Sequence, residues 1–177
     1  AHAELALCLQ YIAFFNFVLP LEIYEESVQA ARRAVQLDDQ LAEAHVAMAG
    51  VGYYLEYDRR SAEQQLRRAL ELNPGSVKAL IHLSWLLGES GRFEEAVEVT
   101  LKAIEYDPLN TVARHALGQV YFLARRFDQA VQAYERALAL DPGDPSLHFS
   151  VALAEAERGN LERALELDRT ALELSGG

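Results

Sequence analysis

The stretch TVARHALGQVYFLARRFDQAVQAYERALALDPGD, residues 111–144, decides the fold of this chain. It contains two runs of apolar residues at helical spacing, separated by Arg125 and Arg126 and closed by an Asp-Pro-Gly-Asp run. Apolar residues three or four positions apart lie on one face of a helix. Proline and glycine after the second run end that helix. The stretch therefore predicts a hairpin of two amphipathic helices.

Small residues in this hairpin stand where the two helices must approach closely. Gly118 in the first helix and Ala130 and Ala137 in the second lack the bulk that would hold the axes beyond their usual separation of about 8–10 Å. Leu117 and Tyr134 supply large apolar area. Because one hairpin cannot cover that area by itself, it must stack on a neighbour.

Internal repeats with a period of 34 residues supply the neighbours. The alanine at the start of the second helix recurs as Ala62, Ala96, Ala130 and Ala164. The later alanine recurs as Ala34, Ala69, Ala103, Ala137 and Ala171, with a first interval of 35 residues. The prolines that end the hairpins are Pro74, Pro108 and Pro142. Three registers in phase indicate an array of stacked helix hairpins.

The repeat resembles the tetratricopeptide repeat (TPR), whose motif has Leu, Gly and Tyr on the first helix and Ala, an aromatic residue, Ala and Pro on the second. The matching residues are Leu117, Gly118, Tyr121, Ala130, Tyr134, Ala137 and Pro142, while Arg114 stands where the family prefers Trp. The resemblance implies an all-α fold, a right-handed α-solenoid of stacked antiparallel helix hairpins. We expect a single array over residues 1–177, with regular repeats at 42–74, 77–108, 111–142 and 145–174.

Residues 1–39 are expected to form a degenerate first repeat. The connection between its helices is about nine residues longer than in the other repeats and contains Pro20, which predicts an extended first helix or a long turn. The apolar run of residues 5–21 is interrupted by Gln10 and Asn16, whereas a spanning helix needs about 20 predominantly apolar residues. We therefore expect a packed helix and no membrane span. The second repeat carries one extra residue near GYYLEYDRR.

Composition narrows the class of partner. The formal net charge of −11, from 27 acidic and 16 basic residues, would repel a polyanion. Nucleic acid is therefore not an expected ligand. The single cysteine, Cys8, excludes an internal disulfide framework.

The family's register places the first helices on the concave wall of the superhelix. The expected wall residues are Val46, Tyr53, Tyr54, Lys78, Ile81, His82, Trp85, His115, Gln119, Phe122, Phe149 and Leu153. This wall lacks the Lys, Arg and Asn residues with which one TPR subgroup grips the C-terminal carboxylate of chaperones. It also lacks the Asn ladder of the glycosyltransferase-associated arrays. The resemblance thus implies a groove for an apolar helix or extended peptide, and core packing of the same aromatic residues is the alternative.

No motif points to catalysis or to a bound metal. His82 and His115 come from successive repeats, but no Cys or carboxylate cluster completes a ligand set. His2, His45 and His148 recur at the place of the family's aromatic residue and are expected to be packing residues. The sequence has no phosphate-binding loop, no nucleophile elbow and no His-Glu-x-x-His motif. We expect no enzyme activity, no metal and no cofactor.

These features favour a scaffold for protein–protein interaction. The chain also resembles TPR arrays at the C-terminal side of bacterial regulatory proteins, which implies a cytoplasmic location. Because it also begins without Met, we expect it to be part of a larger regulator. Two alternatives stay open. The array could oligomerise its parent as a homodimer through uncapped end repeats, using Phe15, Leu165 and Leu172. It could also be a small-molecule sensor with a pocket near Trp85.

Overall fold

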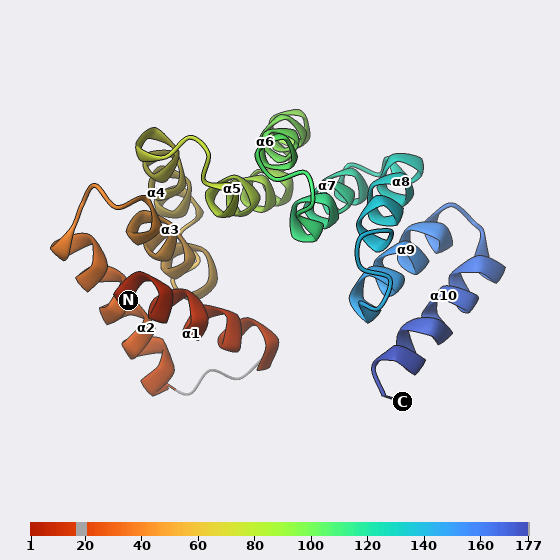
Figure 1. Ribbon diagram of the computed structural model, residues 1–177, viewed down its shortest axis with the longest axis horizontal. Coiled ribbons are helices and arrows are strands. Elements are labelled where there is room, and N and C mark those ends of the chain that lie inside the picture. Colours follow the sequence, from red (N-terminus) through yellow and green to blue (C-terminus); the bar gives the residue numbers. More distant parts are fainter. Residues whose placement is uncertain (17–20, 177) are drawn as a thin grey trace. The chain divides into compact units, whose positions relative to one another are not determined.

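The computed structural model describes the backbone of residues 1–16 and 21–176 and the side chains of residues 1–9 and 25–176. This part of the chain contains helices and connecting turns and no strand (Figure 1). In chain order the helices are α1 (His2–Asn16), α2 (Leu21–Leu37), α3 (Ala42–Gly50), the π-helical turn η1 (Val51–Leu55), α4 (Arg59–Leu72), α5 (Val77–Glu89), α6 (Phe93–Tyr106), α7 (Thr111–Leu123), α8 (Phe127–Leu138), α9 (Pro145–Glu157) and α10 (Leu161–Leu174). The expected all-α fold is confirmed.

The chain forms two compact units, Ala1–Leu86 and Leu87–Gly177. In the first unit α1 packs on α2, α3 packs on α4, and α3 also contacts α1 and α2. In the second unit α6 packs on α7, α7 on α8, α8 on α9 and α9 on α10. Each unit is therefore a stack of helix hairpins. The continuous array over residues 1–177 and its right-handed course stay predictions.

The extra residue of the second repeat is absorbed by η1. Helix α3 and η1 comprise 9 and 5 residues, whereas α5, α7 and α9 each have 13. A π-helical turn widens the helix by one residue without displacing the next helix, and the backbone N–H of Glu56 donates to the carbonyl of Val51 at 3.0 Å. The insertion predicted near GYYLEYDRR is confirmed at this turn.

Each turn between the helices of a regular repeat contains one residue with left-handed backbone. These residues are Tyr57, Gly91, Arg125 and Gly159, with φ values of 55°, 76°, 59° and 85°. They stand 34 residues apart, so the same turn recurs in all four repeats. Glycine adopts this conformation without steric cost, which explains its use in two of them.

The first repeat differs in helix length. Helices α1 and α2 have 15 and 17 residues, compared with 13 and 14 in α5 and α6. The hydroxyl of Ser27 in α2, only 1% exposed, donates to the carbonyl of Ala6 in α1 at 3.3 Å. The connection that contains Pro20, where a long turn was the alternative expectation, lies outside the described residues. Nowhere in the described part is a helix both long and apolar enough to cross a membrane.

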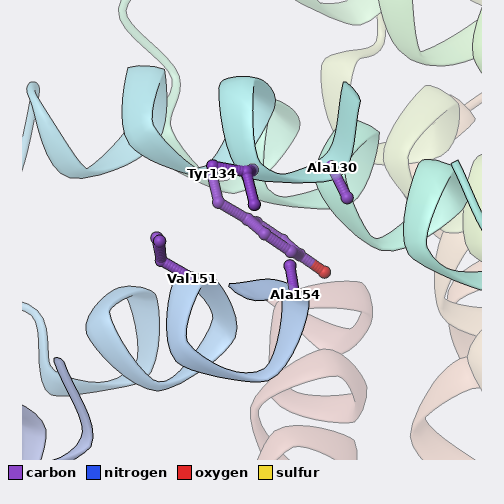
Figure 2. Packing of buried hydrophobic residues seen from close by; sticks show 5 residues of the cluster. Ala130, Tyr134, Val151 and Ala154 are labelled. Carbon is purple, nitrogen blue, oxygen red and sulfur yellow. The ribbon is translucent and has the colours of Figure 1, made fainter. Parts of the chain in front are cut away.

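The core of the second unit is built around Tyr134. Its ring lies between α8 and α9 and packs with Ala130, Val151 and Ala154 (Figure 2). Gly118 of α7 makes room for this ring, because a Cβ at that position would lie 2.3 Å from Tyr134 Cδ1. The close approach predicted at Gly118 thus has a specific cause, the insertion of one aromatic ring.

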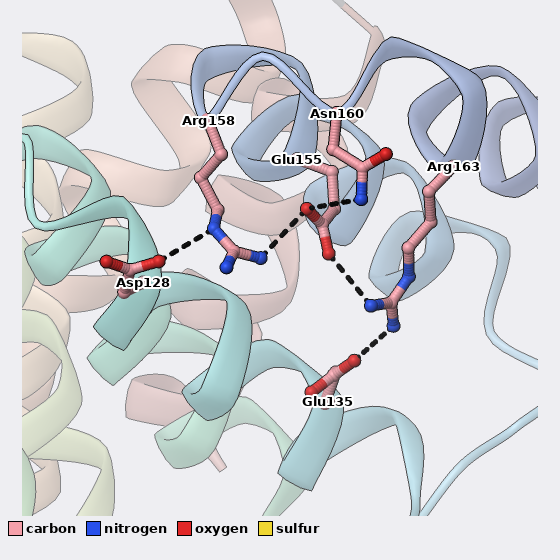
Figure 3. Close-up of polar contacts among 6 residues, drawn as sticks. All are labelled: Asp128, Glu135, Glu155, Arg158, Asn160 and Arg163. Carbon is pink, nitrogen blue, oxygen red and sulfur yellow. Dashed lines mark hydrogen bonds and ion pairs between the residues drawn. The ribbon is translucent and has the colours of Figure 1, made fainter.

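A buried carboxylate ties α9 to α8 and α10. Glu155 is 0% exposed, and its Oε2 accepts a hydrogen bond from Arg158 Nη1 at 2.9 Å. Its Oε1 lies 3.0 Å from Arg163 Nη1 without aligned hydrogen-bond geometry. Arg158 also pairs with Asp128 at 2.7 Å, and Arg163 pairs with Glu135 (Figure 3). The two arginines therefore neutralise Glu155 and link it to α8.

Candidate functional site

An aromatic cluster occupies the face of the first unit where a groove is expected. The rings of Tyr53 and Tyr54 in η1 meet edge to face at 4.6 Å between centroids. Tyr54 lies 6.4 Å from His82 of α5, and His82 lies 5.3 Å from Trp85. Because η1 replaces the last turn of an ordinary first helix, the inserted residue helps to place two tyrosines beside α5. We call these four residues the aromatic cluster.

Two ring nitrogens in this cluster have no hydrogen-bond partner among the described residues. They are His82 Nε2 and Trp85 Nε1, and both are buried. The cluster, with Ala49 and Leu66, encloses a cavity of about 10 Å³, which holds about one water-sized group. A buried polar group without a partner costs about 1–3 kcal/mol. The cavity can therefore take the tip of one acceptor group, such as a carbonyl oxygen. It is too small for the small molecule that a sensor pocket near Trp85 would hold.

His82 is held in its neutral form. Burial, with a smaller effect of the Lys78 ammonium, lowers the pKa of His82 from 6.5 to about 4. Because this folded-state pKa lies below the unfolded value, the contribution of His82 to stability is complete above about pH 6.5. It is lost as the pH falls towards about 4, where protonation favours the unfolded chain.

We therefore expect the first unit to lose stability on the order of 3 kcal/mol between about pH 7 and about pH 4 through this group. Urea unfolding followed by the fluorescence of Trp85, the only tryptophan, measures the loss. His82→Phe keeps an aromatic ring and should flatten this pH dependence, while substitution of the exposed His2 by Gln should leave it unchanged. Equal losses for wild type and His82→Phe would contradict the assignment.

The structure divides the expected wall residues by accessibility. Val46, Ile81 and His82 are 1%, 5% and 8% exposed, so they belong to the interior and do not offer a surface to a partner. Lys78, Phe149 and Leu153 are exposed. The remaining members are half-buried, namely Tyr53, Tyr54, Trp85, His115, Gln119 and Phe122.

In the second unit the exposed wall residues gather on α9. Phe149 and Leu153 are 48% and 43% exposed. A hydrogen bond of 2.9 Å between His115 Nε2 and Ser150 Oγ joins α7 to this part of α9. Phe122 packs instead against Phe127 at 5.6 Å and against the Tyr134 cluster. For Phe122 the structure therefore favours packing in the core, which was the alternative to exposure in a binding groove.

The His115–Ser150 pair is a structural contact. The Ser150 hydroxyl donates to the carbonyl of Ser146 at 2.8 Å, so His115 Nε2 must carry the proton that it shares with Ser150 Oγ. A general base would need that nitrogen unprotonated. Burial lowers the pKa of His115, and the Asp144 carboxylate partly opposes this shift. The pair holds α7 against α9 and does not activate a nucleophile.

The residues at the family's aromatic position have a role that the sequence did not reveal. Three of them donate to a carbonyl six residues earlier, in the turn before the helix. The pairs are His45 Nε2 to Asp39 at 2.9 Å, Arg114 Nη2 to Pro108 at 2.6 Å and His148 Nε2 to Pro142 at 2.9 Å. The sequence predicted packing residues for the histidines. A signal for these hydrogen bonds was present in the sequence, because polar side chains recur at the position where the family usually has Trp. Such side chains can donate a hydrogen bond, and the turn before the helix offers carbonyl groups that accept one.

Two leucines predicted to take part in self-association are exposed at the surface of α10. Leu165 and Leu172 are 58% and 57% exposed, whereas the side chain of Phe15 lies outside the described residues. Among the described residues no group of three His, Cys, Asp or Glu side chains could hold a metal ion.

Comparisons with known proteins agree with the repeat pattern. Two family profiles described as tetratricopeptide repeat match residues 53–120 and 115–177. The type IV pilus assembly protein PilF of Pseudomonas aeruginosa is 28% identical over 131 residues, which cover 72% of this chain and 51% of that protein. Human tetratricopeptide repeat protein 13 is 26% identical over 155 residues, covering 85% of this chain and 18% of that protein. The chain thus spans about half or less of the length of these relatives.

Among solved structures, a thermophilic TPR protein of Thermus thermophilus superposes with a TM-score of 0.80 at 22% identity. The match covers 97% of this chain and 91% of that one. At this identity the likeness concerns the fold, which is that of the TPR solenoids.

Proposed function

This chain belongs to the tetratricopeptide-repeat family, and we propose that its first helices bind an apolar helix or peptide of another protein. Proteins of this family are protein–protein interaction scaffolds and bind protein partners. What we propose for this chain in particular is the surface that binds the partner. We also propose that the array is cytoplasmic and part of a larger regulatory protein, and the resemblance of the sequence to such arrays supports both statements.

The aromatic cluster carries the proposal. Half-buried Trp85, Tyr53 and Tyr54 offer apolar area beside two buried nitrogens that lack partners. A partner that brings one carbonyl oxygen to the cavity would satisfy a donor that the chain itself leaves unpaired, while its aliphatic side chains cover the rings. Aromatic residues in partly formed pockets are typical binding hot spots.

Charge supports the same class of partner. The formal net charge of −11 opposes binding of nucleic acid. Lys78 is the exposed cation among the predicted wall residues and precedes His82 by one helical turn. A partner with an apolar face and a nearby acceptor fits this surface.

The test is a selection from a displayed library of random peptides against the wild-type chain. We expect enriched peptides with aliphatic residues at helical or alternate spacing. Trp85→Phe keeps the ring but removes the N–H donor, and it should weaken their binding several-fold, about the 1 kcal/mol of one hydrogen bond. Phe149→Glu should weaken peptides selected on the second unit by about tenfold or more.

Leu101→Glu is the matched control, because Leu101 is 49% exposed but lies on the second helix α6. Its binding should equal that of the wild type. Circular dichroism of each variant checks that the helices are intact. Peptides that bind Trp85→Phe and Phe149→Glu as well as they bind the wild type would overturn the proposal.

A further inference from the structure

The outer face of α10 carries three leucines that the described residues leave uncovered. Leu161, Leu165 and Leu172 are 63%, 58% and 57% exposed. At about 100° per residue they fall within about 40° of one another around the helix axis. They therefore form one continuous stripe, which we call the α10 stripe.

The same register positions are covered in the preceding repeat. Leu161, Leu165 and Leu172 correspond to Phe127, Val131 and Leu138, each 34 residues earlier. Val131 is 4% exposed, and Leu138 packs against the Tyr134 cluster where α8 meets α9. The α10 stripe is thus a surface of the kind on which this fold packs another helix.

Charged side chains beside the stripe identify the occupant. Glu162, Glu166 and Arg169 line a shallow hollow with Leu165, and none of the three has an ion pair within the part of the chain that the structure describes. At the register of Glu162, by contrast, Asp128 pairs with Arg158. This face of α10 therefore presents acidic side chains, Glu162 and Glu166, and a basic one, Arg169, that can each form an ion pair with a second molecule.

We infer that the α10 stripe is the interface of a homodimer in which two copies of α10 pack antiparallel about a two-fold axis. Such an interface must be complementary to itself. The midpoint of Leu161 and Leu172 falls at 166.5 and the midpoint of Glu162 and Arg169 at 165.5, which is a separation of about 1.5 Å along the helix. One two-fold axis near residue 166 therefore brings Leu161 close to Leu172 of the second copy and Glu162 close to its Arg169, and it places the two Leu165 side chains near each other.

Light scattering coupled to size exclusion, over a range of protein concentrations, tests this interface. The mass should rise from 19.7 kDa towards twice that value. Leu165→Glu should keep the mass at the lower value, while Leu109→Glu, at a position 74% exposed before α7, should behave as the wild type. A monomer at every concentration, or a dimer that Leu165→Glu leaves intact, would overturn the inference.

Charge reversal tests the pairing itself. Glu162→Arg and Arg169→Glu should each weaken the dimer, because each places like charges opposite one another across the axis. The double variant restores opposite charges and should dimerise as the wild type does. If the double variant is as weak as the single ones, the antiparallel arrangement is wrong.

Discussion

Replacement of Gly118 by alanine is expected to destabilise the second unit by about 3 kcal/mol, at the upper end of overpacking effects. The new Cβ would lie 2.3, 2.4 and 2.8 Å from Cδ1, Cε1 and Cγ of Tyr134. Real Cβ atoms do not approach other atoms so closely, so the ring or a helix must move. Tyr134 is 3% exposed and is confined by Val151 and Ala154 (Figure 2), which leaves the ring little room. Urea unfolding followed by circular dichroism measures the loss.

The repeats themselves suggest the compensating change. The positions of Gly118 and Tyr134 are occupied in the second repeat by Ala49 and Leu66. Tyr134→Leu should therefore be less harmful with Gly118→Ala than in its absence, so that the two losses are not additive. Gly88→Ala is the control, since its Cβ would meet Leu123 and Val120 at an ordinary 3.5 Å, and it should be neutral or stabilising by about 0.5–1 kcal/mol. A fully additive double variant would contradict the proposed contact.

Arg163→Gln is the second change with a large expected effect, a loss of about 2–3 kcal/mol. Removing one member of a buried ion pair usually costs about 3–5 kcal/mol, and we expect less because Arg158 stays beside Glu155 and the Arg163 side chain is 45% exposed. The physical reason is that the fully buried Glu155 carboxylate would be left with one cationic partner in place of two (Figure 3). Urea unfolding measures the change.

An apolar replacement should remove the need for the arginine. Tyr121 and Leu87 hold the register of Glu155 in the preceding repeats, and Gln129 holds that of Arg163. Glu155→Leu should therefore recover most of the stability lost in Arg163→Gln, because no buried charge remains. Arg136→Gln, at an exposed arginine of α8, is the control and should change stability by less than about 0.5 kcal/mol. If Glu155→Leu and Arg163→Gln add their losses, the network does not work as described.

The helical hairpins could be predicted because their signals are local. Alanine and glycine at a fixed period mark helix contacts, and the interval of 35 residues in one register located the insertion that becomes η1. The long first helix of the first repeat was expected only as one of two possibilities, the other being a long turn, since residues 5–21 show no regular period. An apolar period of 3.6 residues can be read from a helix's own sequence, so these helices could be predicted without knowing which other helices pack on them.

Accessibility within the candidate site could not be predicted in the same way. The register assigns Val46, Ile81 and His82 to the wall, but adjacent helices bury them, and burial depends on the size of side chains in other repeats. The ion pairs of Glu155 were missed for a related reason. Sequence spacing shows that Arg158 follows Glu155 by three residues. It does not show that the Glu155 carboxylate is buried at the register position that Tyr121 holds in the preceding repeat.

Hydrogen–deuterium exchange of the chain, with and without a selected peptide, tests the binding claim most directly. We predict slower exchange in η1 and in the first helices α5 and α9, which carry the aromatic cluster and the exposed Phe149 and Leu153. Exchange in the second helices α4, α6 and α8 should be nearly unchanged. Slower exchange confined to the second helices would contradict the claim that the first helices bind the partner.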